Sequence, residues 1–265
     1  DYLYDYTCME TLQGLSAAEL TTTDGRKWRS AYSDPANDTR VGLDDTVWPG
    51  GFERMEQFIQ DTGLTAADLK LNYDDVTEMF GNGQLAMYFG TSAGVKMFQE
   101  QGIDATFLPF FSQNGEKWLM TTPYFQVALN RDLEQDNARR EKAMQVLHVM
   151  LSEDAQAQIL AEGQDLLSYS QSVNYHLTDT MKDVRSAVDE NHMYIRIASN
   201  DFFAISQDVV SKMITGEYDA AQAYRAFNAS LLAEETPNTG DIVLKNENAY
   251  SNVFHKNGGN ASFSV

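Results

Sequence analysis

The sequence predicts a helix-rich α/β fold, and three observations carry this prediction. Residues 72–110 alternate between helical patterns, short apolar runs and glycine turns, which is typical of α/β proteins. Amphipathic helices with apolar residues at i, i+3 and i+4 recur along the rest of the chain. The 265 residues, of which 43% are hydrophobic, are enough to form a core in one large domain or in two lobes.

The stretch 72–110 is expected to hold two helices and two strands. The first helix is capped by Asp74 or Asp75 and ends at residues 81–83, where Gly-Asn-Gly tolerates positive φ. Residues 84–89 form a short, mostly apolar run of the kind found in buried strands. A second helix follows, and residues 105–109 are expected to form the next strand.

Gly90, Thr91 and Ser92 form the turn between the first of these strands and the second helix. Small molecules bind open α/β sheets at the carboxyl ends of strands, and a helix start offers free backbone N–H groups. Gly90 also has no side chain that would block a ligand. The alternative is a plain strand-to-helix turn in which a hydroxyl caps the helix.

The rest of the chain is expected to be mostly helical, with polar loops. Residues 34–45 form a loop with four aspartates, but it lacks the glycine and the final glutamate of a calcium loop, so we expect no metal there. The helix at 136–151 should bury its apolar face, which consists of Ala143, Val146, Leu147 and Met150. The expected elements are helices at 1–13, 15–32, 51–62, 136–151, 152–160, 179–190, 202–215 and 219–232, a turn at 112–115, strands at 118–120, 125–129 and 241–244, an extended piece at 194–198 and a linker at 234–240.

The composition excludes several classes of partner. The net charge of −20 argues against nucleic acid and anionic lipid, which both need a positive surface. The single cysteine, Cys8, excludes a disulfide within the chain and is expected to be a small buried residue. No run of 18 apolar residues and no basic leader occurs, so a secreted protein would be shown here without its signal peptide.

No catalytic or metal-binding pattern is present in the sequence. The four histidines, His148, His176, His192 and His255, lack the spacing of zinc ligands. Neither a nucleophile elbow (Gly-x-Ser-x-Gly) nor a phosphate-binding loop of the Gly-x-x-x-x-Gly-Lys type occurs. We therefore expect a protein that is not an enzyme and that uses no cofactor.

A helix that ends in Phe80, followed by Asn82-Gly83 and by Ala-Met-Tyr-Phe-Gly at 86–90, resembles the signature segment of family 1 extracellular solute-binding proteins. These are receptors of ABC importers, in the cluster that includes maltose-binding protein. The resemblance extends from about Asp44 to about Leu232. It implies a periplasmic-binding-protein-like type II fold with two α/β lobes, of which this chain holds mainly the second lobe and part of the first.

The resemblance implies four parts. Residues 1–125 are similar to a portion of the second lobe, 126–185 to a segment that returns to the first lobe, 186–232 to the closing helices of the second lobe, and 233–265 to a linker or tail toward a further domain. The opening of the first lobe has no counterpart, and Leu166-Leu167-Ser168 stands where the family usually has a proline. We therefore expect a piece of a longer protein.

The resemblance also implies which residues face a ligand. Polar groups would hold the hydroxyls of a sugar and aromatic rings would stack on its apolar faces. The alternative for the two phenylalanines is that one lies in the core and the other faces outward. The candidates are Gly90, Thr91 and Ser92 in the turn, Tyr124 and Phe125 at the crossover between lobes, Asn200, Asp201, Phe202 and Phe203 at the start of a closing helix, and Met9 and Gln13 as part of the wall.

The function that the resemblance implies is non-catalytic solute binding. Two lobes would close by a hinge around a saccharide and deliver it to the permease of an ABC importer. We expect a monomer in the periplasm or outside the cell, for example a cell-surface lipoprotein. The alternative is an enzyme-associated or nucleotide-recognising surface protein, because the tail after Pro237 could lead into a nucleotidase-like domain. A surface interaction module without a ligand is the third hypothesis.

Overall fold

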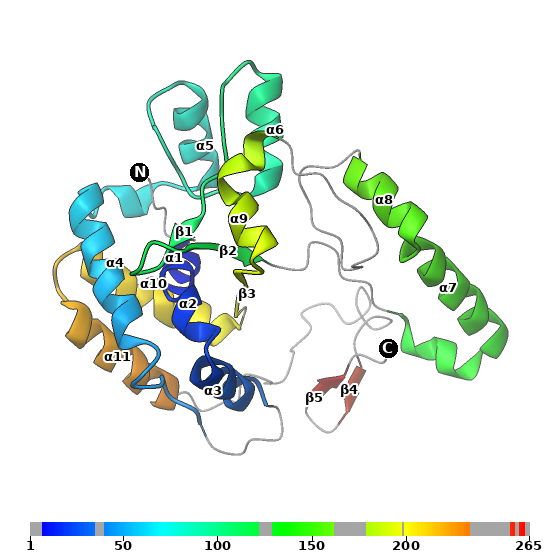
Figure 1. The fold of residues 1–265 in the computed structure, drawn as a ribbon. Helices are drawn as coiled ribbons and strands as arrows, with labels where there is room; N and C mark the ends of the chain where they lie inside the picture. The colour runs from blue at the N-terminus through cyan, green and yellow to red at the C-terminus, as the bar shows by residue number, and fades with distance from the viewer. Residues whose placement is uncertain are drawn as a thin grey trace. The chain divides into compact units, whose positions relative to one another are not determined.

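The computed structural model describes residues 7–34, 40–121, 129–161, 179–197, 199–233, 255–257 and 260–262. This part of the chain is helix-rich and contains a small three-stranded sheet, which agrees with the predicted helix-rich α/β class (Figure 1). The chain divides into two compact units. Unit 1 comprises residues 1–122 and 178–238, and unit 2 comprises residues 123–177 and 239–265. Unit 1 is therefore built from two chain segments, with a segment of unit 2 between them in the sequence.

The main body of unit 1 is a group of helices from both of its segments. Helix α1 packs against α4 and α10, and α11 also packs against α4 and α10 (Figure 1). Helix α4 ends before Gly63, whose φ of 67° is the left-handed conformation common at helix ends. The helices of this body are α1 (Cys8–Leu15), α2 (Ala17–Leu20), α3 (Thr23–Ser33), α4 (Pro49–Thr62), α10 (Asn200–Ile214) and α11 (Ala220–Ala233).

Aromatic rings from distant parts of the sequence form the centre of the main core. The ring of Trp48 lies 5.1 Å from that of Trp28 and 5.4 Å from that of Phe202. The ring of Phe202 in turn lies 4.9 Å from that of Phe227. Trp48, Phe202 and Phe227 have no exposed surface, and Cys8 is also buried, as predicted. These contacts join the first helices of unit 1 to its last two.

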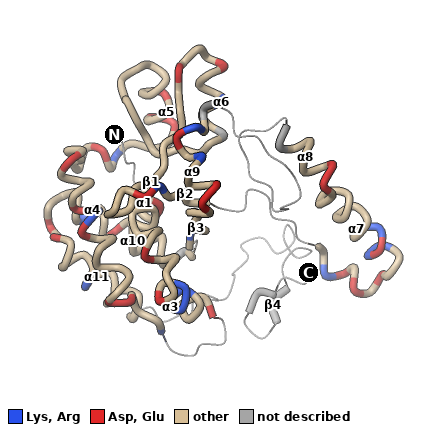
Figure 2. The backbone as a smooth tube through the Cα atoms, in the orientation of Figure 1, with Lys and Arg blue, Asp and Glu red and all other residues tan. Residues whose placement is uncertain are grey.

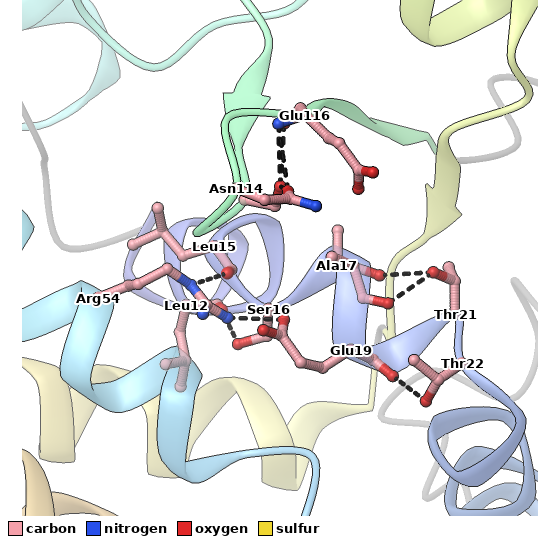
Figure 3. A network of polar contacts seen from close by, with 12 residues as sticks. Leu12, Leu15, Ser16, Ala17, Glu19, Thr21, Thr22, Arg54, Asn114 and Glu116 are labelled. Atoms are coloured by element: carbon pink, nitrogen blue, oxygen red, sulfur yellow. Dashed lines mark hydrogen bonds and ion pairs between the residues drawn. The ribbon is translucent and has the colours of Figure 1, made fainter.

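Helices α1 and α4 approach closely because α4 has a glycine at the contact. An added Cβ at Gly51 would lie only 1.9 Å from Oγ of Ser16. One turn further along α4, Arg54 donates from Nε to the carbonyl of Leu15 at 2.6 Å and from a terminal nitrogen to Glu19 at 2.6 Å (Figure 3). A steric fit and a fully hydrogen-bonded ion pair thus fix the same interface.

The sheet of unit 1 has the strand order β1-β2-β3. Strands β1 (Phe110–Phe111) and β2 (Lys117–Thr121) are antiparallel and are joined by the predicted turn, in which Gly115 has φ 81°. Strand β3 (Met193–Ile195) runs parallel to β2, with Met120 opposite Tyr194 and Thr121 opposite Ile195. The parallel pair joins the two chain segments of unit 1.

A second, smaller core lies between α5 (Tyr73–Gly81) and α6 (Ser92–Glu100). Val95 and Phe98 of α6 are buried there, as their spacing predicted. The cap of α5 was predicted wrongly. Asn72 is the N-cap and accepts from the backbone N–H of Asp74 and Asp75, while the Asp75 carboxylate accepts from the N–H of Asn72.

The strands expected at 84–89 and 105–109 are not formed, and none of the described strands pairs with either run. Tyr88 packs on Phe98 in the small core, with ring centroids 6.0 Å apart. Phe89 packs against Phe58, also at 6.0 Å, at the edge of the main core. The run 84–89 therefore contacts both cores through its side chains but lacks the backbone pairing that defines a strand.

Shorter helices complete the described part of unit 1. Helix η2 (Asp68–Lys70) precedes α5, and η4 (Asp179–Val184) and α9 (Arg185–Asp189) precede β3. The helix expected at 179–190 is therefore present as two consecutive pieces. The extended piece expected at 194–198 begins one residue earlier, as β3, and Ala198 lies outside the described residues.

Unit 2 contains η3 (Arg131–Gln135), α7 (Asn137–Met150), α8 (Glu153–Ala161) and the hairpin of β4 (His255–Asn257) with β5 (Asn260–Ser262). The burial predicted for α7 is wrong among the described residues. Val146 is 60% exposed and Met150 is 47% exposed, and the other two residues of the predicted face, Ala143 and Leu147, are only half-buried. Residues 125–128 and 241–244, where strands were expected, lie outside the described residues.

We expect Gly51→Ala to destabilise unit 1 because the new methyl group meets Ser16. Overpacking of this kind lowers the free energy of unfolding by about 1–3 kcal/mol, which thermal or urea unfolding would measure. Gly50→Ala is the matched control, because the nearest atom to its added Cβ is the end of the Arg54 side chain at 3.4 Å. In a double variant, Ser16→Ala should restore part of the stability that Gly51→Ala loses. Equal stability of the two glycine variants would contradict this packing.

Candidate functional site

The candidate site lies at the carboxyl ends of β2 and β3. Both strands point to the same edge, and the backbone N–H of Arg196 donates to the carbonyl of Thr121 at 3.2 Å. Open α/β sheets bind small molecules at such edges. We call Glu10, Gln13, Thr121 and Arg196, which meet at this edge of unit 1, the strand-edge cluster.

Gln13 of α1 fixes the backbone that leaves β3. Its Nε2 donates to the carbonyl of Ile197 at 3.1 Å, and its Oε1 accepts from the N–H of Ile197 at 2.7 Å. The same Oε1 accepts from the hydroxyl of Tyr194 at 3.0 Å. Because Gln13 has no exposed surface, these bonds are shielded from water. The connection between β3 and α10 is therefore held in one position.

Glu10 lies one turn before Gln13 on the same helix face and forms an ion pair with Arg196. The side chains are 14% and 31% exposed, respectively. Burial raises the pKa of Glu10, and a backbone hydrogen bond and the charge of Arg196 oppose this shift. Oε2 of Glu10 and Nε of Arg196 are both buried and have no hydrogen-bond partner in the part of the chain that the structure describes.

Tyr194 supports the cluster from β3. The guanidinium carbon of Arg29 lies 5.1 Å from the centre of its ring, a cation–π geometry. Burial raises the pKa of the Tyr194 phenol, and the charge of Arg29 opposes this shift. The phenol therefore stays neutral at physiological pH and serves as a hydrogen-bond donor to Gln13.

Helix α10 begins just after the strand-edge cluster. Oγ of Ser199 caps it by accepting from the N–H of Phe202 at 3.3 Å, and this Oγ lies 3.0 Å from the hydroxyl of Tyr32. Asn200 is the first helical residue, and Asp201 is half-buried in the first turn. An acid at this position also stabilises the helix through the macrodipole. The positions of Asn200 and Asp201 at the helix start therefore fit contact with a ligand and a purely structural role equally well.

The two phenylalanines of α10 have different environments. Phe202 is fully buried among the aromatic rings of the main core, so it has no exposed surface with which to stack on a solute. This corrects its proposed role as a ligand-facing ring. Phe203 is half-buried and packs against the same core, so part of its ring stays at the surface.

Gly90, Thr91 and Ser92 lie in a separate part of unit 1, beside the small core. Gly90 does not follow a strand, which removes one argument for a ligand at this turn. An added Cβ at Gly90 would lie 3.3 Å from the ring of Tyr88, a close contact that a small shift of this side chain would relieve. Thr91 is the N-cap position of α6 but makes no capping hydrogen bond with its side chain. Burial raises the pKa of Tyr88 to about 12.

Two further candidates, Met9 and Gln13, give no exposed surface to a ligand. Met9 and Gln13 are buried, at 3% and 0% exposure, which corrects their assignment to the wall. Tyr124 and Phe125 lie outside the described residues. Sequence patterns did not identify Glu10 or Arg196, because the two charges are 186 positions apart in the sequence. Only the fold brings them together.

The described residues hold no group of three or more histidine, cysteine or acidic side chains that could bind a metal ion. None of the described helices has the length and the apolar character needed to cross a membrane. Figure 2 shows acidic residues on helices of both units, in keeping with the net charge of −20. A comparison of the sequence with models of known families finds no match, and a comparison with curated proteins finds none either.

We expect Gln13→Leu to destabilise unit 1 strongly. The substitution leaves the N–H and the carbonyl of Ile197 and the hydroxyl of Tyr194 unpaired in a buried site. Each unpaired group costs about 1–3 kcal/mol, so urea unfolding should show a loss of about 3 kcal/mol or more. Tyr194→Phe removes one of the donors only and should cost about 1 kcal/mol. A Gln13→Leu variant as stable as the wild type would show that these bonds do not hold the connection.

The raised pKa of Glu10 predicts a pH-dependent stability. Because the carboxyl group binds its proton more tightly in the folded chain, folding gains stability as the pH falls through the folded pKa toward the ordinary value of 4.5. The difference in free energy of unfolding, wild type minus Glu10→Gln, should therefore grow between about pH 7 and about pH 5. Chemical unfolding at several pH values measures this difference. A difference that shrinks as the pH falls over this range would mean that folding lowers the pKa of Glu10 instead of raising it.

Proposed function

We propose that the protein is a non-catalytic solute receptor that binds a saccharide and serves an ABC importer. One observation carries the proposal beyond the resemblance in the sequence. Unit 1 is built from two chain segments, 1–122 and 178–238, and the chain enters unit 2 between them. Such repeated passage between two units is expected for a receptor whose two lobes close around a ligand.

The geometry of unit 1 supports the same proposal. Its two segments meet in the parallel pair β2–β3, and the strand-edge cluster lies at the end of that pair where small molecules bind. Gln13 and the Ser199 cap hold the backbone rigid around this edge. A preformed polar edge favours binding because little conformational entropy is lost when a ligand arrives. Phe203, Asp201 and Asn200 begin the adjoining helix.

The proposal includes the cellular setting that the resemblance implies. The receptor would act in the periplasm or at the outer cell surface, for example as a lipoprotein, and would pass its solute to the permease as a monomer. We also propose that the chain has the two-lobed fold of this family and supplies mainly its second lobe. Among the residues that the structure describes, none favours the nucleotide-recognising alternative, which enters here as an outcome of the test.

The experiment is a thermal-shift screen of the chain against neutral sugars, polyols, amino acids and nucleotides. A ligand that binds only the folded state adds about 2.7 kcal/mol of stability at a hundredfold excess over its dissociation constant, and the melting temperature rises accordingly. We expect a rise with one class of saccharide. A rise with nucleotides alone would favour the alternative function, and no rise with any saccharide would contradict the proposal.

A further inference from the structure

The two partly buried arginine–glutamate pairs of unit 1 differ in one respect. In the Arg54–Glu19 pair, Nε of Arg54 donates to the carbonyl of Leu15, and a terminal nitrogen donates to Glu19 (Figure 3). Among the described residues, five buried side-chain nitrogen or oxygen atoms have no hydrogen-bond partner. None of the five belongs to Arg54 or Glu19. Two of those five atoms belong to the other pair: Oε2 of Glu10 and Nε of Arg196. Of the two pairs, only Glu10–Arg196 contains buried atoms without a partner among the described residues, and we call it incomplete and the Arg54–Glu19 pair complete in this sense.

An incomplete buried ion pair is unfavourable for the protein alone. Charged groups lose their hydration on burial, and a missing hydrogen bond leaves that loss without compensation. A buried polar atom without a partner calls for an explanation, and a ligand that completes its hydrogen bonds is one such explanation. The position of this pair fits that explanation, because Arg196 directly follows β3 and lies at the carboxyl edge of the parallel strands.

The chemistry of the pair restricts the ligand. Glu10 offers a hydrogen-bond acceptor and Arg196 offers a donor, and their charges cancel. Because the two charges cancel, neither an anion nor a cation gains a net attraction from the pair, and an apolar group would leave both atoms unpaired. A hydroxyl group both donates and accepts, so two neighbouring hydroxyls can satisfy both atoms at once.

We propose that the Glu10–Arg196 pair is the recognition element for a neutral polyhydroxy solute at the strand edge of unit 1. The proposal rests on the receptor function proposed above and names the residues that select the solute. Small movements of the two side chains, which are 14% and 31% exposed, would bring the unpaired atoms to the ligand. Gln13 and Thr121 act as positioning residues, because their contacts hold the backbone that carries Arg196.

The test is calorimetric titration of the complete chain with glucose, galactose, xylose, maltose and cellobiose, followed by the same titrations on variants. Glu10→Gln and Arg196→Lys should each weaken binding of the best neutral sugar by about tenfold or more. Glu10→Gln removes the negative charge that strengthens the acceptor, and Arg196→Lys keeps the positive charge but removes the guanidinium Nε–H. Glu19→Gln is the matched control, since it makes the same change in the complete ion pair. Its affinity should equal that of the wild type.

A second measurement distinguishes recognition from a structural role. Removing the negative charge of Glu10 should make an anionic sugar more acceptable, so the ratio of dissociation constants for glucuronate and for the neutral sugar should fall in Glu10→Gln. A purely structural ion pair would change both constants alike. If the variants do not fold, the Nε–H NMR signal of Arg196 in the wild type serves instead. It should shift when the neutral sugar is added.

The outcomes separate this inference from the receptor function. If the wild type binds a neutral sugar but the variants bind it equally well, or the Arg196 signal does not move, the inference is wrong and the receptor function stands. If the wild type binds none of the neutral sugars, both proposals are wrong. Weaker binding in both variants, with an unchanged Glu19→Gln control, would support the inference.

Discussion

Unit 1 depends on the hydrogen bonds that Gln13 makes with Ile197 and Tyr194. These bonds tie α1, near the start of the described chain, to the segment between β3 and α10, 184 positions later. Apolar side chains of the main core also join these parts of the chain, but apolar contact is not directional. The glutamine determines where the connection lies and therefore where Arg196 and the start of α10 are placed. A buried amide with complete hydrogen bonding is well suited to this role.

Local patterns in the sequence predicted much of the secondary structure. Helices α4, α10 and α11 were expected within one or two residues of their bounds, because apolar periodicity and end signals act over a few residues. Phe52 and Met55, three positions apart, are both fully buried. The turn at residues 112–115 followed from the glycine that its backbone needs. Such features require no knowledge of distant segments.

Features that depend on distant contacts could not be predicted in the same way. Residues 84–89 were expected to form a strand, but a strand also needs a distant segment that pairs with it, and none of the described strands does so. Val146 was expected to be buried, but an apolar stripe does not reveal whether another element covers it. The Glu10–Arg196 pair has no local signal, since neither residue stands out in its own segment. The resemblance likewise names ligand candidates by their positions along the chain and does not show which of them are exposed. Phe202 is fully buried in the structure, so it cannot contact a ligand there.

The most direct test of the central claim, that a solute binds at the strand edge, is hydrogen exchange measured by mass spectrometry with and without the best neutral sugar. Binding there should slow exchange in peptides that cover 8–15 and 193–203, because a bound ligand suppresses opening of the segments that it contacts. The small core between α5 and α6 should show little change. Sugar-dependent protection confined to α5 and α6, with none at 8–15 or 193–203, would place the solute elsewhere and contradict the account.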